Sequence, residues 1–204
     1  LGVRNIFVVM GDPTNIGDYP EAADNYDIVP SGLVRLIKHN LNQGQDWAGN
    51  PIGQPTNFLV SCALNLNAAD SEREIRALRK KLESGADYLI TQPVFDVETY
   101  RRFLEHYTAQ HGPLSTPVLA GLLPLYSVRH ASFLHHEVPG ISIPDAIMQR
   151  IEAAGEDAPR EGVRIAQELA AGLLQSGVVG LYLLPQFGRY DLTAEIIESV
   201  RSAG

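Results

Sequence analysis

Residues 85–96, GADYLITQPVFD, carry the pattern on which the predicted fold depends. The apolar run 88–91 is short and suits a strand that is buried on both faces of a parallel sheet. Asp96 follows it and can cap the start of a helix. Apolar side chains then recur at helical spacing, at Tyr100, Phe103, Leu104 and Tyr107. A buried strand followed by an amphipathic helix is one βα unit.

The same alternation continues on both sides of this unit. Similar apolar runs occupy residues 5–10, 57–63, 117–122 and 180–184. Ser71 and Glu74 have the spacing of a capping box, in front of the helical stripe Ile75, Leu78 and Leu82. Further helices are expected at residues 144–154, 163–174 and 192–201. Residues 42–56, NQGQDWAGNPIGQPT, are rich in Gly, Pro and amides and should form a loop.

The five predicted βα units fit a single domain with either of two architectures. With 204 residues, 45% apolar and 20% charged, the chain has the composition of one globular domain. Five units can form an open doubly wound sheet, or they can be part of a closed barrel, which needs eight strands. The pattern alone does not choose between them.

Charge, cysteine content and missing motifs exclude several classes of function. The net charge of −8 comes without a run of Lys or Arg, so we expect no nucleic acid and no membrane as a partner. The lone Cys62 cannot form an intrachain disulfide, which suits a cytoplasmic protein. The six histidines lack metal-binding spacing, so no metal site is expected. There is also no GxGxxG after a strand, no P-loop and no GxSxG.

Polar side chains follow several predicted strands, at the ends where parallel α/β proteins bind ligands. Asp12 follows Gly11, and its carboxylate could bind the edge of an amino-pyrimidine or only cap the loop before Pro13. Gln92 has one acceptor and two donors, the set that can pair with a pterin edge. A polar strand end without a ligand is the alternative, and the residues alone leave both interpretations open.

Four segments together resemble the methylenetetrahydrofolate reductase family. They are residues 3–13 (VRNIFVVMGDP), 46–52 (DWAGNPI), 85–92 (GADYLITQ) and 121–125 (GLLPL), and they occur in the family's order. Residues 93–95 (PVF) and 184–190 (LPQFGRY) look closer to the bacterial branch in which the reductase follows a homocysteine S-methyltransferase domain. By this resemblance, such a fused domain would lie before Leu1.

The resemblance implies an α/β fold of the (β/α)8 TIM barrel type, in which residues 1–204 supply the C-terminal part with the last five βα units. It implies FAD at the C-terminal mouth of the barrel and NADH or NADPH as the hydride donor. The implied reaction reduces a folate substrate, 5,10-methylenetetrahydrofolate, to 5-methyltetrahydrofolate. The preference for NADH or NADPH and the oligomeric state do not follow from it, and a homo-oligomer is one alternative.

Matched by position, the resemblance also gives roles to seven residues. Asp12 would contact the folate and modulate the flavin, which makes it the catalytic candidate, and Gln92 would bind the pterin. Two more residues, His130 and Arg189, match folate-contact positions. Other members of the family carry a different residue type at the position of His130. The positions on the flavin side are Gly11, Asp12, Glu74 and Lys81.

The resemblance is incomplete at three places. Met10 stands where the family often has an arginine, and Asn65 and Asn67 replace a segment of Tyr-Pro-Glu type. The family's proton-donating glutamate belongs to the first barrel strand, and no residue here matches it. We therefore expect this chain alone neither to bind FAD tightly nor to turn over. The alternatives are a barrel module that binds folate or flavin without chemistry, and an open five-strand domain that serves as an interaction platform.

Overall fold

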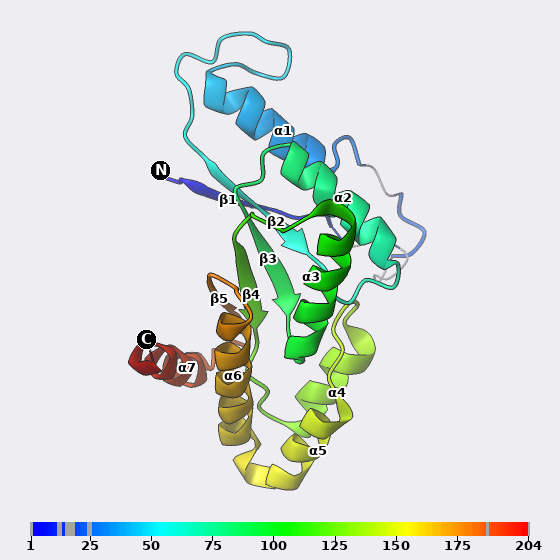
Figure 1. Ribbon diagram of the computed structural model, residues 1–204, viewed down its shortest axis with the longest axis vertical. Coiled ribbons are helices and arrows are strands. Elements are labelled where there is room, and N and C mark those ends of the chain that lie inside the picture. The colour runs from blue at the N-terminus through cyan, green and yellow to red at the C-terminus, as the bar shows by residue number, and fades with distance from the viewer. Residues whose placement is uncertain (1, 12–13, 15–18, 24–25, 187, 204) are drawn as a thin grey trace. The chain divides into compact units, whose positions relative to one another are not determined.

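The computed structural model of the chain describes residues 2–11, 14, 19–23, 26–186 and 188–203 (Figure 1). Its strands lie at the five predicted positions: β1 (Asn5–Val8), β2 (Leu59–Leu64), β3 (Tyr88–Pro93), β4 (Val118–Leu122) and β5 (Gly180–Leu183). Its α-helices are α1 (Pro30–His39), α2 (Ser71–Glu83), α3 (Val97–His111), α4 (Val128–Glu137), α5 (Asp145–Ala154), α6 (Ala158–Gln175) and α7 (Tyr190–Ala203). Two short 3-10 helices follow α1 and α5, η2 (Leu41–Gln43) and η3 (Gly155–Asp157).

The described strands form one five-stranded sheet in the order β1-β2-β3-β4-β5. β1 pairs with β2 in parallel, with Asn5 opposite Leu59, and β4 pairs with β5 in parallel, with Leu119 opposite Gly180. A doubly wound sheet reverses its strand order at a switch point. The observed order has no reversal, so the described strands exclude the doubly wound alternative and have the sequential order of a barrel.

The chain's internal contacts divide it into two compact units. The first unit comprises Leu1–Ala63 and Ile75–Leu89. Here α1 packs on β1, and Val34 and Ile37 of α1 are buried. The carboxylate of Asp87 accepts hydrogen bonds from Lys38 Nζ at 2.8 Å and from the Val60 amide at 2.7 Å. Asp87 therefore ties α1 to β2 inside this unit.

The predicted loop at residues 42–56 is confirmed, apart from the overlap with η2. Asn42 holds its far end, because its Oδ1 accepts from Thr56 Oγ1 at 2.7 Å and from the Phe58 amide at 3.0 Å. Asp46 accepts from the backbone and side-chain nitrogens of Asn50, and these bonds lower the pKa of Asp46. The loop is thus built from side chains that bond to its own backbone.

The second unit comprises Leu64–Glu74 and Ile90–Gly204. Its helices α6 and α7 share an apolar cluster of Val163, Ala166, Leu192 and Ile196, against which Tyr126 and Leu183 pack. Arg150 of α5 joins α6 through Glu161 and Glu168, at 2.7 Å and 2.6 Å. Most of the large apolar side chains of α6 are buried, whereas Leu174 in its last turn is 36% exposed.

Two further helical predictions have different outcomes. Asp96 caps α3 as expected, because its Oδ1 accepts from the Glu98 amide at 3.0 Å. The capping box at Ser71 is wrong. Asp70 Oδ1 accepts from the Arg73 amide at 2.8 Å, while Ser71 Oγ bonds to His106 Nδ1 at 3.2 Å. Asp70 takes the cap because its carboxylate reaches the first turn from one position earlier.

Gly162 lets α6 lie directly on the backbone that follows β4. A Cβ at this position would overlap the carbonyl group of Leu125. We expect Gly162→Ala to destabilise the protein by about 1–3 kcal/mol, because overpacking outweighs the better helix propensity of alanine. Urea denaturation measures this loss.

Gly172→Ala is the matched control in the same helix, since its Cβ meets a side chain, Val97 Cγ2 at 2.9 Å, and not backbone. We expect a smaller loss there. Equal losses at the two glycines would contradict the close backbone approach at Gly162.

Candidate functional site

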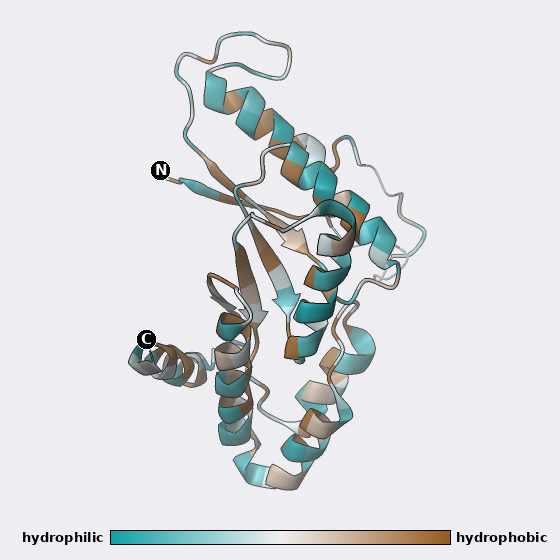
Figure 2. Cartoon of the chain, viewed as in Figure 1, coloured by the Kyte–Doolittle hydropathy of each residue, from teal (hydrophilic) through white to brown (hydrophobic). Residues whose placement is uncertain are grey.

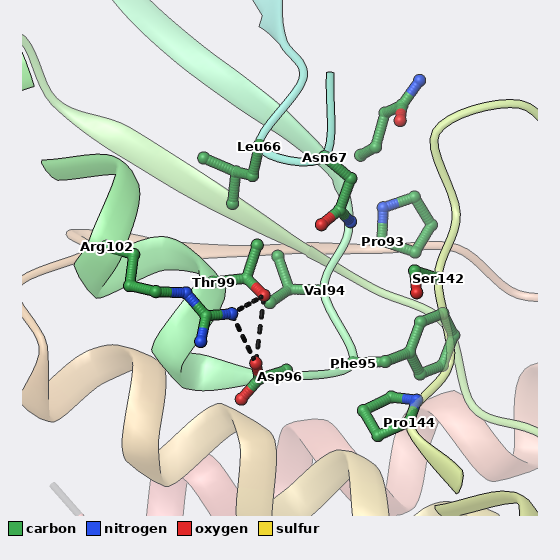
Figure 3. Close-up of a pocket in the computed structure, with 11 residues that line it drawn as sticks. Leu66, Asn67, Pro93, Val94, Phe95, Asp96, Thr99, Arg102, Ser142 and Pro144 are labelled. Atoms are coloured by element: carbon green, nitrogen blue, oxygen red, sulfur yellow. Dashed lines mark hydrogen bonds and ion pairs between the residues drawn. The ribbon is translucent and has the colours of Figure 1, made fainter. Parts of the chain in front are cut away.

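A pocket of about 190 Å³ lies at the C-terminal end of β3, wholly within the second unit. Figure 2 shows β3 changing from brown to teal toward its arrowhead, so the strand becomes polar where it reaches the pocket. Three segments form the walls (Figure 3). They are Leu66 and Asn67 after β2, residues 92–96 with Thr99 and Arg102 of α3, and Ser142 with Pro144 before α5.

Gln92 is one of the residues that line this pocket. Its Oε1 is buried, and no described residue supplies a hydrogen bond to it. A buried polar atom without a partner costs roughly 1–3 kcal/mol. A donor on a bound ligand would remove that cost, so the geometry favours the functional interpretation of Gln92 over that of a satisfied strand end.

Hydrogen bonds between Thr91 and the β4 backbone hold the end of β3. Thr91 is 3% exposed, and its Oγ1 accepts from the Gly121 amide at 2.9 Å and donates to the Gln92 carbonyl at 2.7 Å. The Val94 amide donates to the Gly121 carbonyl at 2.9 Å. The backbone on both sides of Gln92 is therefore fixed.

Charged and hydroxyl groups from the start of α3 line another part of the pocket (Figure 3). Arg102 donates to Asp96 Oδ2 and to Thr99 Oγ1, each at 3.2 Å. The Arg102 side chain is 67% exposed, so this ion pair contributes at most about 1 kcal/mol. Its guanidinium can therefore exchange Asp96 for an anionic group of a ligand at little cost.

The predicted flavin-side residues lie in both units. Asp12 falls outside the described residues, and Gly11 is exposed with nothing within 4 Å of where its Cβ would be. Lys81 Nζ donates to the Ala63 carbonyl at 2.8 Å, in the first unit. In the second unit, Glu74 Oε1 accepts from the Asn65 amide at 3.2 Å. The roles in flavin binding stay predictions.

His130 is buried at the start of α4. It is 5% exposed, its ring stacks on Tyr126 at 4.1 Å, and its amide donates to Ser127 Oγ, the cap of the helix. Burial lowers the pKa of His130 to about 4, so the imidazole is neutral at neutral pH. Its predicted contact with a substrate stays a prediction.

Arg189 lies beyond β5 and pairs with a neighbour in sequence. Its guanidinium bonds to the Asp191 carboxylate at 2.9 Å, which raises the pKa of Arg189 and lowers that of Asp191. Arg189 is not among the residues that line the pocket with Gln92. The predicted contact of Arg189 with the folate therefore stays a prediction.

Four residues that line the pocket were given no role from the sequence: Asn67, Thr99, Arg102 and Ser142. Thr99 and Arg102 could have been found, because Thr99 follows the capping Asp96 at i+3 and Arg102 follows Thr99 at i+3, a spacing that makes helical side chains neighbours. Ser142 lies far from Gln92 in sequence, so no local signal predicts it.

Two other kinds of site, a metal centre and a membrane-spanning helix, are not found in the described part of the chain. No group of three or more His, Cys, Asp or Glu side chains there could hold a metal ion. No helix there is long and apolar enough to cross a membrane.

Comparisons with known proteins add a family context to this geometry. Residues 1–201 match the family model described as methylenetetrahydrofolate reductase. Methylenetetrahydrofolate reductase 2 of Saccharomyces cerevisiae is 28% identical over 188 residues, 87% of this chain and 28% of the relative. The 5,10-methylenetetrahydrofolate reductase of Escherichia coli is 24% identical over 180 residues, 87% of this chain and 54% of the relative. The chain thus spans about a quarter to a half of these relatives' lengths.

One solved structure is similar in fold. It is described as an uncharacterized protein from Clostridium thermocellum that binds two copies of 5-methyl-5,6,7,8-tetrahydrofolic acid. The TM-score is 0.54 at 18% identity, covering 72% of this chain and 55% of that one. At this identity the likeness concerns the fold alone.

The low pKa of His130 predicts a defined pH dependence of stability. Between about pH 4 and pH 6.5 the unfolded chain takes up a proton that the folded chain does not, so stability falls as the pH falls through this range. The loss between pH 8 and pH 5 should be about 2 kcal/mol.

Urea denaturation at these two pH values, with His130→Gln, measures the effect. The variant should lose this part of the pH dependence, whereas His136→Gln, at an exposed position on the same helix, should keep it. A His130→Gln protein with the full wild-type difference would show that His130 does not cause it.

Proposed function

This chain belongs to the methylenetetrahydrofolate reductase family, and from that premise we propose that it contributes the folate site of a flavin-dependent reductase. The reaction would reduce 5,10-methylenetetrahydrofolate to 5-methyltetrahydrofolate, with FAD as cofactor and NADH or NADPH as hydride donor. The observation that supports this most is the buried, unpartnered Oε1 of Gln92 in the pocket at the end of β3.

The amide of Gln92 suits one edge of a pterin. Its oxygen accepts from a ring N–H while its nitrogen donates to the neighbouring carbonyl or ring nitrogen. A pocket of about 190 Å³ holds one end of a folate and leaves the remainder outside. The Clostridium thermocellum protein of similar fold is described as binding a methylated tetrahydrofolate, which belongs to the class of ligand proposed here.

The residues assigned to the flavin fit that group in part. Gly11 leaves open space beside its Cα, which suits the close approach of a flat ring. Lys81 Nζ donates to the Ala63 carbonyl, and its positive charge suits a phosphate group. A bound flavin would supply the redox chemistry. By the family resemblance, Asp12 would place a carboxylate beside the reacting rings.

We also propose that the sheet closes into an eight-stranded barrel with strands from preceding sequence. The strands at its two ends are exposed, with Phe7 of β1 at 41% and Tyr182 of β5 at 39%, while β2, β3 and β4 are largely buried. Barrel closure would cover these side chains. The family's acidic residue for protonating the folate would belong to those strands, and a homocysteine S-methyltransferase domain would precede them.

The second candidate is a folate- or flavin-binding module without chemistry. His130 and Met10 favour it, because both differ in residue type from what the family resemblance implies at their positions. The two proposals differ in whether a bound flavin changes its oxidation state.

Absorbance spectra of the complete natural protein test the proposed function. We expect an oxidised-flavin band that NADH or NADPH bleaches and that 5,10-methylenetetrahydrofolate restores, with 5-methyltetrahydrofolate as the product. A band that the nicotinamide cofactors leave unchanged would favour the binding module. The 204-residue chain alone should be colourless and should not support NAD(P)H oxidation by menadione, and a yellow, active fragment would contradict the incomplete site.

Variants of Gln92 and Asp12 test the residues. Gln92→Ala removes about two hydrogen bonds to the pterin, so kcat/KM for the folate should fall roughly 10- to 100-fold while flavin reduction by NAD(P)H is unchanged. Asp12→Asn should lower turnover with near-normal folding.

Gln110→Ala is the matched control. Gln110 lies on the surface of α3, where it bonds to Glu72 of α2, so this variant should have wild-type kinetics. Wild-type turnover in both Gln92→Ala and Asp12→Asn would contradict the roles proposed for these two residues.

A further inference from the structure

The amide of Gln92 packs against one glycine of a loop that is distant in sequence. Gly140 follows α4 and has φ of +80°, in the left-handed region that favours glycine. A Cβ on Gly140 would overlap Gln92 Oε1 and would lie 3.1 Å from Asn65 Nδ2. The loop therefore approaches the Gln92 amide as closely as a backbone can.

The turn after β2 holds Gly140 on one side. Asn67 Nδ2 donates to the Gly140 carbonyl at 3.4 Å, and the Asn67 amide donates to Asn65 Oδ1 at 3.0 Å. The Asn65 amide in turn donates to Glu74 Oε1 of α2 at 3.2 Å. This chain of bonds connects the first turn of α2 to the backbone beside Gln92.

Contacts with α4 hold the loop on its other side. The Ile143 amide donates to His135 Nδ1 at 3.0 Å, and the Ile143 side chain is 1% exposed. The Ile141 amide donates to the Val138 carbonyl at 3.2 Å. The loop is thus fixed on both sides of Gly140 and presents a rigid surface to Gln92.

We infer that Gly140 is a positioning residue for folate binding, which acts by fixing the orientation of the Gln92 amide; this inference rests on the proposed function. A glutamine side chain has three rotatable bonds, and each must be fixed before the amide can pair with a planar edge. Close packing by Gly140 fixes it in advance, so the ligand does not pay for that ordering. Asn67 is the second member of this support, through its bond to the Gly140 carbonyl.

A double-mutant cycle tests this role in the complete natural protein, with the dissociation constant of 5-methyltetrahydrofolate as the readout. Gly140→Ala should weaken binding roughly tenfold, because its Cβ displaces the Gln92 amide. In a Gln92→Ala background the same change should have an effect of less than about twofold, because the displaced group is gone. A glycine with a merely structural role would give equal effects in the two backgrounds.

Gly177→Ala is the matched control, because Gly177 also has positive φ, +95°, but nothing lies within 4 Å of its Cβ position. It should bind folate as the wild type does. If Gly140→Ala fails to fold, Gly140→Asn and Gly177→Asn repeat the comparison with a residue that tolerates this backbone conformation. Reduction of bound flavin by NAD(P)H confirms that each variant is folded.

The outcomes separate this inference from the proposed function. Wild-type affinity in Gly140→Ala, or equal effects of Gly140→Ala with and without Gln92, would overturn the positioning role and leave the reductase intact. A wild-type protein that reduces its flavin but binds no 5-methyltetrahydrofolate would overturn the proposed folate site and this inference with it.

Discussion

The close approach of β4 to the end of β3 is the constraint on which the candidate site depends. Gly121 makes it feasible, because a Cβ there would lie 2.7 Å from the Thr91 carbonyl oxygen. The Gly121 amide and carbonyl then bond to Thr91 Oγ1 and to the Val94 amide. These contacts fix where β3 ends, and they set both the position of Gln92 and the start of the helix that Asp96 caps.

The strands were predictable because a buried parallel strand needs a continuous apolar run, and each run in the sequence formed one. Helices α1 and α4 were not predicted, although Pro30 at the first helical position of α1 and Ser127 as the cap of α4 are start signals. The capping box failed because the helix already begins at Ser71, so Asp70 caps it through the Arg73 amide and the Glu74 amide donates to the Asp70 carbonyl.

The site was predictable only in part. Gln92 stands out because it is a polar residue at the end of a buried strand. The resemblance to the reductase family then predicted which ligand it binds, the pterin of a folate. Gly140 and Asn67 were not predictable, because their roles arise from contacts between loops that are far apart in the sequence. The burial of His130 was not predicted either; it lowers the pKa of His130 and makes it a neutral side chain that packs on Tyr126.

The proposed function depends on Gln92 binding a pterin. The NMR signal of the Gln92 side-chain amide, in ¹⁵N-labelled complete protein, tests this most directly. The signal is assigned by its loss in Gln92→Ala and followed while 5-methyltetrahydrofolate is added. We expect the signal of the Gln92 amide to shift until it saturates, while the signal of Gln110, which bonds to Glu72, does not move. A Gln92 amide that stays unshifted while the protein saturates with folate would contradict it.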